Sequence, residues 1–600
     1  MGGKQRSSAP PPSAPFAGDL LLDFGPEGAT PRGRTESSAW ETLAQDPEWR
    51  LLAQRPGAGW RGFPLTSFVS EDWRAWLLGE LYGASREAMP YPEGLSRERE
   101  SAARLNGHFL LLAWNARTRR WHVWTDRFGT IHAYFASGPG HPAIGTFSPG
   151  VARAAACGTL DWLGLAGFFS FGFFARDRTF FEGVRILRPA THAVFDERGT
   201  PETAERYWLW RHEPDGARDY DGTVEEFAGL LARVMEEQTR EGRVAIPISG
   251  GLDSRSTVAA LPRERLAEGR LWSYSYGWAR DSVETRIAGR IATARGLPFE
   301  AFTIGAYLPE QLDRVLSCVE GFQDATQSRQ AGVTEELRKH AEFVIAAHLG
   351  DLWLGDMGLS DRREAGEEEV LSHALSKISK RGNSWLLEKL CSPKLGADPA
   401  ALLREEVRPE MERLRHIQDP DFRVKAFKTE QWSFRWTIAS LRMFQPGAFP
   451  RLPFYDTRLS DFFATVPSAF VAKRRLQVDY LKRFAPDLAR VPWQKFGANL
   501  YRARYFHSWL LPERALRRAW KTIRGAKTIQ RNWEVQLLSA EGKRMLHERL
   551  LRPGLRVHDL VAPPEIRALL DEFFADPSDP ARGYTVSMLL TFAAWLELYG

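Results

Sequence analysis

The sequence predicts an α/β protein in which a β-rich first part is followed by a parallel sheet with covering helices and then by a mostly helical part. Short apolar stretches separated by turn residues recur over residues 108–210, which is typical of an antiparallel sheet domain. From residue 243, strand-like stretches alternate with helical ones, as in a parallel sheet whose strands are joined by helices. From about residue 365 the helical pattern continues to the end.

The first part divides into a tail and a sheet domain. The tract SSAPPPSAP at 7–15 has too few apolar residues to pack, so residues 1–15 are predicted to be a disordered tail. We expect a first domain over residues 16–212 and a second over 220–600, joined by the polar segment HEPDGARDYDG. The expected strands of the first domain are HFLLLAW (108–114), RWHVWTD (120–126), AIGTF (143–147), THAVFD (191–196) and ERYWLW (205–210).

The second domain begins with a strand that ends in a glycine-rich turn. Its expected parallel strands are VAIPI (244–248), LWSYSYG (271–277), FEAFTIG (299–305) and FVIAAHLGD (343–351), with a helix over 281–296. The carboxyl end of such a sheet is where open α/β folds bind ligands. Gly250 and Gly251 let an anion approach the backbone, and the hydroxyls of Ser249 and Ser254 can donate to it.

This turn therefore predicts a phosphate site, with a glycine-rich turn of no chemical role as the alternative. It fits neither GxxxxGK[ST] nor GxGxxG, and it carries an acid, Asp253, where those motifs have none. A carboxylate beside phosphates indicates a metal ion between them.

Composition limits the partners of the chain. Lysine and arginine number 81 against 75 acidic residues, a net charge of +6, part of it over residues 512–531. That stretch is either a surface for a polyanion or acidic peptide, or a solvated helix face. Three cysteines are too few for a disulfide framework, which indicates a reducing compartment. No stretch reaches the roughly 18 apolar residues of a membrane span, so we expect a cytoplasmic protein with no membrane partner.

The turn SGGLDS (249–254) resembles the pyrophosphate loop of ATP pyrophosphatases, which split ATP between its α and β phosphates. Further segments, in the same order along the chain, resemble the asparagine synthetase family: LNGHFLLLAWNARTRRWHVWTDRFGTIHAYFA (105–136), TFFEGVRILRPATHAVFD (179–196), RYWLW (206–210) and FPRLPFYDTRLSDFFATVP (449–467). The resemblance implies an N-terminal Ntn-hydrolase-like αββα sandwich, then a parallel-sheet ATP pyrophosphatase domain with a largely helical C-terminal part. It also implies ATP and Mg²⁺ as cofactors.

The sequence departs from the glutamine-using members of this family. Those members begin with a cysteine whose thiolate attacks the glutamine amide. Gly2 stands in that place, and the first cysteine is Cys157, so we expect no glutaminase activity. The same absence marks two branches that close rings within one molecule, the β-lactam synthetases and the macrolactam synthetases of lasso peptides. Leu352, in AAHLGDLWLGDM (346–357), resembles the β-lactam synthetases more closely.

The resemblance assigns the phosphate and metal ligands. Those expected to hold ATP phosphates are Ser249, Gly250, Gly251, Asp253 and Ser254. Asp253 and Asp351 follow two different strands and are expected to share Mg²⁺, although Asp351 could instead cap a helix. Lys495, in VPWQKFGAN, is expected to stabilise the negative charge that develops as pyrophosphate leaves; the alternative is an ordinary surface lysine.

Other positions concern the base and the nucleoside. His348 is expected to act as base for the attacking amine, with Glu430 as its partner, or to be a buried histidine satisfied by backbone. Ser275 and Gly277 are expected to lie beside adenosine, where Glu284 would orient the region or be a helix-surface carboxylate. Arg255 would contact phosphate or point into solvent.

The predicted activity is that of an ATP-dependent, AMP-forming amide ligase that adenylates a carboxylate and joins it to an amine, with intramolecular cyclisation as one form. The alternatives are an asparagine synthetase that uses ammonia, a tRNA-modifying adenylating enzyme and a non-catalytic scaffold. The expected partners are a carboxylate substrate, either a small molecule or a precursor peptide, and a protease or peptide-recognition protein that would act with it. Nucleic acid is not expected among them.

Overall fold

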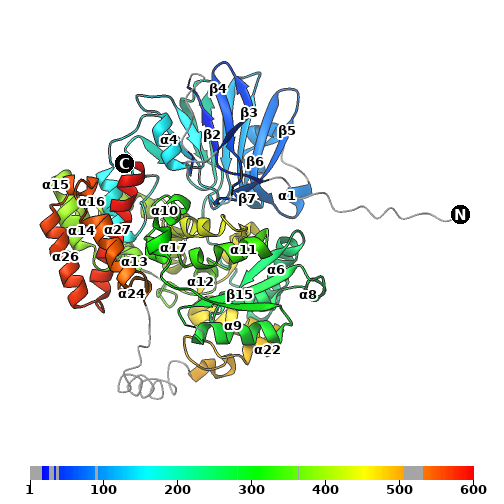
Figure 1. Cartoon of the computed structure of the whole chain (residues 1–600). Coiled ribbons are helices and arrows are strands. Elements are labelled where there is room, and N and C mark those ends of the chain that lie inside the picture. The colour runs from blue at the N-terminus through cyan, green and yellow to red at the C-terminus, as the bar shows by residue number, and fades with distance from the viewer. Residues whose placement is uncertain are drawn as a thin grey trace.

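Two antiparallel sheets make up the N-terminal part of the molecule (Figure 1). The computed structural model describes residues 16–25, 33–34, 39–57, 59–87, 92–279, 281–362, 364–505 and 531–600. One sheet has the order β1 (Phe16–Ala17), β5 (Phe63–Val69), β6 (Trp73–Leu81), β7 (Gly107–Asn115), β8 (Arg120–Thr125), β12 (Thr191–Asp196) and β13 (Pro201–Arg206). The other has the order β11 (Val184–Ile186), β9 (Tyr134–Ala136), β10 (Ala143–Gly145), β2 (Leu20–Asp23), β4 (Trp49–Gln54) and β3 (Trp40–Asp46).

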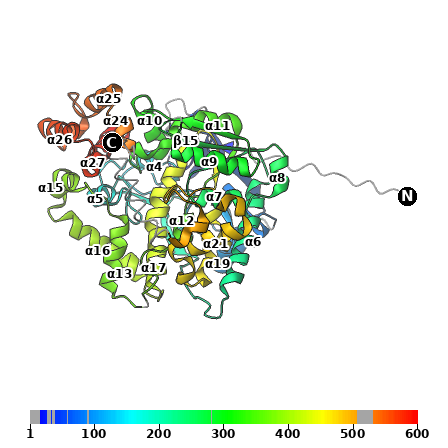
Figure 2. The same ribbon diagram turned by 90° about the horizontal axis from the view of Figure 1, so that it is seen from below.

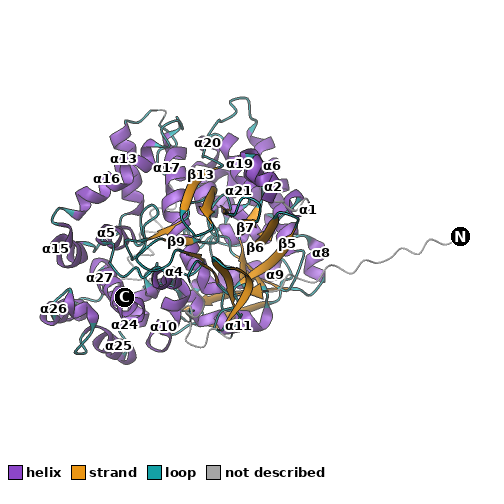
Figure 3. Ribbon diagram, turned by 90° about the horizontal axis from the view of Figure 1, so that it is seen from above, coloured by secondary structure: helices purple, strands orange, loops and turns teal. Residues whose placement is uncertain are grey.

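The two sheets face each other across an aromatic core. The ring of Trp49 on β4 lies 5.2 Å from that of Trp114 on β7 and 4.7 Å from that of Trp121 on β8. Helices α2 (Pro92–Arg97) and α3 (Arg99–Ala103) cover the outer face of the larger sheet, and α4 (Ser148–Ala154) packs on β9 and β10 of the other. Every residue of β7 is buried because both faces of its sheet are covered. The predicted αββα layering is confirmed (Figure 3).

The expected strands over 108–114, 120–126, 143–147 and 191–196 are all present, while the one over 205–210 is largely wrong. Strand β13 ends at Arg206, because the residues that follow turn toward the second domain. There the ring of Trp210 lies 4.7 Å from that of Trp208 and 5.5 Å from that of Trp353.

The second domain is built on a five-stranded parallel sheet. Its order is β16 (Phe299–Thr303), β15 (Leu271–Gly277), β14 (Val244–Pro247), β17 (Phe343–Ile345) and β18 (Phe449–Arg451). The first four are the strands that the sequence predicts, and β18 is an addition from the region expected to be helical. Helix α9 (Val283–Ala294) packs on β15 and β16, and α6 (Tyr220–Thr239) packs on α21 (Arg475–Phe484) (Figure 2).

The rest of the chain is mostly helical, as predicted. Between the sheet strands and after them lie α7 (Asp253–Ala259), α8 (Arg263–Ala267), α10 (Leu308–Val319), α11 (Thr334–His340), α12 (Gly350–Trp353), α13 (Glu367–Ile378), α16 (Pro399–Glu412), α17 (Pro420–Lys428), the π-helix η4 (Thr429–Thr437), α18 (Ile438–Leu441), α19 (Thr457–Thr465), α20 (Ser468–Val471) and α22 (Pro486–Ala489). The chain ends in α24 (Asn532–Leu537), α25 (Ala540–Leu550), α26 (Pro563–Ala575) and α27 (Pro580–Tyr599).

Helix α27 also contacts the first domain, where the ring of Trp595 stacks on Phe180 at 3.7 Å. None of the described helices combines the length and the apolar character needed to cross a membrane. The basic stretch over 512–531 falls outside the described residues except for its last position.

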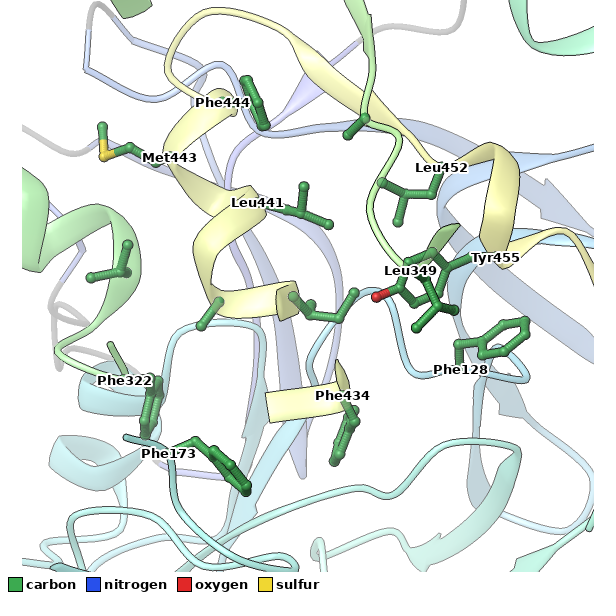
Figure 4. Close-up of a cluster of buried hydrophobic side chains, with 14 of the residues drawn as sticks. Phe128, Phe173, Phe322, Leu349, Phe434, Leu441, Met443, Phe444, Leu452 and Tyr455 are labelled. Carbon is green, nitrogen blue, oxygen red and sulfur yellow. The ribbon is translucent and has the colours of Figure 1, made fainter. Parts of the chain in front are cut away.

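Apolar packing and ion pairs join the two domains. In Figure 4, Phe128 of the first domain lies near Phe434 and Tyr455 of the second, and the Phe128 and Tyr455 rings are 5.2 Å apart. The Nε and Nη2 atoms of Arg451 on β18 each donate a hydrogen bond of 2.7 Å to the carboxylate of Glu80 on β6. A cavity of about 20 Å³ is found at this junction, which is room for about one water molecule.

Candidate active site

The turn after β14 is organised by its own hydroxyl groups. The Oγ of Ser254 accepts a hydrogen bond from the backbone N–H of Ser249 at 3.0 Å and lies 3.0 Å from the Oγ of Ser249. The Oγ of Ser249 accepts in turn from the N–H of Gly251 at 3.2 Å. Both serine side chains are thus held in the turn, at the carboxyl end of the central strand, where open α/β folds bind ligands.

A cavity of about 390 Å³ opens beside this turn. Of the residues that the sequence assigns to the site, its walls include Ser249, Asp253, Ser254, Ser275, His348 and Asp351. Further walls come from Tyr276, Glu284, Arg329 and Trp432. Side chains from three strand ends and from η4 therefore meet around one space.

Asp253 and Asp351 lie close together because Gly350 has no side chain. A Cβ at Gly350 would lie 3.0 Å from the Cγ of Asp253. Burial raises the pKa of Asp253, Arg474 opposes this, and the charge of Asp351 raises it further. The Oδ1 atom of Asp253 accepts from Arg474 at 2.7 Å and from Gln477 at 3.0 Å.

These two carboxylates fit a magnesium ion that takes its other ligands from phosphates and water. Mg²⁺ is commonly bound through one or two carboxylates plus substrate phosphates, rather than in an all-protein cage. Consistent with this, the described residues contain no group of three or more His, Cys, Asp or Glu side chains suited to a metal. Mutual repulsion of Asp253 and Asp351 favours a cation between them.

His348 faces the cavity as a neutral imidazole. Burial lowers its pKa to about 4, the charge of Asp351 opposes this, and Arg329 lowers it further. Its Nδ1 atom has no hydrogen-bond partner among the described residues. The alternative of a histidine satisfied by backbone is therefore not seen at Nδ1, which is buried without a partner.

Lys495 does not line the cavity, but its turn lies against the phosphate loop. The N–H of Gln494 donates to the carbonyl of Gly250 at 3.1 Å, and a Cβ at Gly250 would lie 2.8 Å from the Cβ of Gln494. Gly250 is thus needed for this close approach. Lys495 itself is exposed, with its Nζ 5.4 Å from the ring centroid of Phe496.

Arg255 neither contacts the phosphate site nor points into solvent. Its side chain is fully buried and donates to the carbonyls of Leu488, Val491 and Pro492, at 3.2, 2.8 and 2.8 Å. These carbonyls precede the Lys495 turn. Arg255 therefore anchors that turn to the helix that follows the phosphate loop.

Glu430 is not brought to the cavity, so it cannot partner His348 in this structure. It lies on η4 and forms ion pairs with Arg206 of the first domain and with Arg413. These partners lower its pKa against the opposing effect of burial. Glu430 does lie on a helix, but its side chain points to the domain junction rather than into the cavity.

At the nucleoside end, Ser275 lines the cavity and Gly277 does not. A Cβ at Gly277 would lie 2.4 Å from the Oγ of Ser282, which caps α9 by accepting from the N–H of Thr285. Gly277 therefore allows strand and helix to meet. Glu284 faces the cavity; burial raises its pKa, and Arg329 opposes that change.

Three side chains at or beside the cavity were not anticipated: Arg329, Trp432 and Arg474. Arg474 reaches Asp253 from a left-handed backbone position, φ 66°, next to Lys473 at φ 52°. Such backbone strain is typical of functional sites. The run KRR in the sequence was the only available signal, and it does not reveal which arginine turns inward.

Comparisons with known proteins give one family match, in the second domain, and low similarity to solved structures. Residues 226–436 match the family model of asparagine synthase. No curated protein sequence matches the chain. Among solved structures, glutamine phosphoribosylpyrophosphate amidotransferase from B. subtilis with ADP and GMP has 10% identity and a TM-score of 0.19 over 48% of this chain and 60% of its own. An allosteric regulatory enzyme of purine biosynthesis has 9% identity and a TM-score of 0.20 over 48% and 75%.

The chain spans less than two thirds of the length of the first of these structures. Because the similarity to both structures is so low, the fold is judged from the topology of this chain itself. The family match includes the phosphate loop, His348 and Asp351, whereas Lys495 lies beyond it. Residues 226–436 are therefore similar to an asparagine synthase domain, and this region of the chain supports the asparagine synthetase family.

Proposed function

We propose that the protein is an ATP-dependent, AMP-forming amide ligase that adenylates a carboxylate and joins it to an amine not supplied by glutamine. The observation that carries the proposal is the meeting of the SGGLDS turn, the Asp253–Asp351 pair and His348 around one cavity, within an asparagine synthase domain. The carboxylate belongs to a small molecule or to a peptide. In the second case the amine can lie in the same molecule, and a protease or peptide-recognition protein would act alongside.

The turn would hold the phosphates of ATP through Ser249, Ser254 and its backbone N–H groups. Asp253 and Asp351 would hold magnesium, which supplies neutralisation of the pyrophosphate charge. Ser275 and Tyr276, at the end of β15, provide the wall beside which the nucleoside would lie. With ATP so placed, the substrate carboxylate attacks the α-phosphorus from the His348 side, and pyrophosphate leaves toward the loop.

Lys495 would complete the site when its turn closes over the phosphates. The turn already contacts Gly250, and the exposed ammonium is free to reorient because it forms no ion pair among the described residues. A compact positive charge there would stabilise the departing pyrophosphate.

Amide formation requires that the attacking amine lose a proton. His348 lines the cavity and is neutral at physiological pH because its pKa is about 4. It can therefore accept that proton without first being deprotonated.

The cysteines give no support to a glutaminase step. Burial raises the pKa of Cys157, of Cys318 to about 11 and of Cys391 to about 12. A thiol that attacks an amide needs a lowered pKa or an adjacent base. None of the three lines the cavity, which also argues against a tRNA-modifying enzyme with a catalytic cysteine pair.

The test is trapping of the activated acyl group. The purified protein is incubated with ATP, Mg²⁺, hydroxylamine and a panel of carboxylates, and acyl hydroxamate, AMP and pyrophosphate are quantified together. We expect equal amounts of AMP and pyrophosphate with an active carboxylate, and loss of both in Asp253→Asn. Asp313→Asn, a surface acid paired with Arg549, is the matched control and should retain activity. Release of ADP and phosphate instead would refute the proposal.

A further inference from the structure

Two tryptophans form a flat apolar face beside the cavity. Trp432 and Trp436 on η4 are stacked, with ring centroids 5.3 Å apart and an angle of 13° between the rings. Both are partly exposed, and Trp432 lines the cavity. π-Helical segments are rare in proteins, and those that occur are often found at functional sites.

The opposite face of η4 is fixed by the first domain. The Nε2–H of His132 donates to the carbonyl of Phe434 at 2.7 Å, and the N–H of Arg176 donates to the side chain of Gln431 at 2.9 Å. The tryptophan pair is therefore a preformed surface rather than a mobile one.

Three lysines surround the end of this surface. Lys428, the last residue of α17, places its Nζ 4.6 Å from the ring centroid of Trp432. Helix α13, which carries Lys377, packs on α17, and Lys380 follows two residues after α13. Burial lowers the pKa of Lys428, the charge of Asp351 opposes this, and Lys377 lowers it further. Burial also lowers the pKa of Lys380, the charge of Asp324 opposes this, and Lys428 lowers it further. Lys428 is thus close enough to both other lysines to be repelled by them.

Lys380 and Lys428 are partly buried, whereas Lys377 is exposed. Partly buried arginines at the domain junction, such as Arg413 and Arg206, are paired with carboxylates. Within the part of the chain that the structure describes, no carboxylate lies within ion-pair distance of the three lysines. Partly buried charges of one sign without an ion-pair partner are unfavourable unless an anion joins them.

We propose that the tryptophan pair and the three lysines form the binding site for a second anionic group of the carboxylate substrate, with an apolar or planar part of that substrate lying on Trp432 and Trp436. The assignment rests on the proposed function. It restricts the substrate to compounds that carry a second negative charge beyond the carboxylate to be activated.

The spacing of the two sites supports this assignment. A nucleotide on the SGGLDS turn would fill much of the 390 Å³ cavity, so the second substrate must extend outward past Trp432. Its activated carboxylate would lie near His348, and the rest would cross the tryptophan rings toward Lys428. The positive charge of Lys428 also lies where it acts on Asp351, so the lysine site and the metal site are adjacent.

The test uses two dyes that share an aromatic skeleton. 8-Anilinonaphthalene-1-sulfonate carries a negative charge, whereas N-phenyl-1-naphthylamine does not. Each is titrated against the full-length protein with saturating ATP and Mg²⁺, and binding is followed by energy transfer from tryptophan. We expect Lys428→Met to weaken binding of the sulfonate at least about 10-fold, as for loss of a charge-assisted contact, and to leave the neutral dye unchanged. Trp432→Ala should weaken both dyes.

The matched control is Lys389→Met, a lysine of the same region that is paired with Glu565 and should bind both dyes like wild type. Equal affinity of wild type and Lys428→Met for the sulfonate would overturn the proposal. So would displacement of the sulfonate by added pyrophosphate in wild type but not in Lys428→Met, because the lysines would then hold the product of ATP cleavage. The dye assay needs no turnover, so it can fail or succeed independently of the hydroxamate assay.

Discussion

Replacing Arg255 by methionine tests whether the phosphate loop and the Lys495 turn are held as one unit. The guanidinium is fully buried and donates three hydrogen bonds to the carbonyls of residues 488, 491 and 492. Methionine has a similar length but no donor, so all three carbonyls lose this partner. The side chain does not contact the cavity, so any effect on catalysis must pass through the turn.

The magnitude follows from two opposing contributions. A hydrogen bond from a charged donor contributes about 1.5–3 kcal/mol, so three contribute roughly 4.5–9 kcal/mol. Burial lowers the pKa of Arg255 to about 10, which corresponds to roughly 3 kcal/mol of desolvation that methionine would not incur. The net expected loss lies between roughly 1.5 and 6 kcal/mol, and a loss of about 3 kcal/mol within this range gives roughly a 100-fold increase in local opening of this segment.

Hydrogen exchange measured by mass spectrometry on peptides over residues 486–500 provides the assay. We expect about 100-fold faster exchange there in Arg255→Met, unchanged exchange in the first domain, and slower AMP formation. Arg265→Met, which removes an arginine paired only with Glu268 on the surface, is the control. Unchanged exchange over 486–500 in Arg255→Met would show that the three hydrogen bonds do not hold the turn, and the structural link between Arg255 and Lys495 would be wrong.

Three further predictions concern catalysis and stability. Lys495→Met should bind ATP with nearly unchanged affinity in equilibrium titration, yet its turnover should fall by about 100 to 1,000-fold. The reason is that the positive charge of Lys495 would act mainly as pyrophosphate leaves. A defect confined to ATP affinity would contradict this role. Glutamine alone should yield no glutamate above a protein-free blank; glutamate release would contradict this prediction, and release that survives Cys157→Ala would show that it does not depend on that thiol. Burial lowers the pKa of His108 to about 4 in the folded protein, in which its Nε2 accepts a hydrogen bond from the N–H of Leu452. In the unfolded chain the pKa of this histidine is near 6.5, so as the pH falls the unfolded chain takes up the proton first. The contribution of His108 to the free energy of unfolding is therefore fully present above about pH 6.5 and is lost toward pH 4, by about 2 kcal/mol at pH 5. His108→Gln should reduce this pH dependence in calorimetric scans. The same pH dependence in the variant and the wild type would show that another group causes the acid sensitivity.

Local patterns were sufficient to predict most strands and the turn SGGLDS at the end of β14. The strands of the parallel sheet are short apolar runs between helices, and the loop needs glycine for the approach of a backbone or an anion. Strand β18 was not predicted because it has only three residues and is defined by its pairing with β17, for example between Phe343 and Phe449. Such a strand has no periodicity of its own, since it is defined by its neighbour.

The errors within the site have a different physical origin, the direction of side chains. Glu430 and Trp432 are two residues apart on one helical segment, yet one lies in ion pairs at the junction and the other lines the cavity. Residues two apart lie on different sides of a helix, so only one of them can face the cavity, and the sequence does not show which one. Arg255 and Arg474 were uninformative in the sequence for a related reason, because an arginine can reach a carbonyl, a carboxylate or water with the same residues around it.

The contacts of η4 with the first domain indicate a role for that domain in the proposed function. His132, Arg176 and Arg178 of that domain bond to Phe434, Gln431 and Arg435, all within one turn of Trp432. A π-helix is held less well by its own hydrogen bonds than an α-helix, so external contacts must fix it. If the first domain loosened, η4 could relax, and Trp432 would leave the cavity wall. In the proposed function, which uses no glutamine, the sheet domain would therefore serve as a support for the ligand-binding wall.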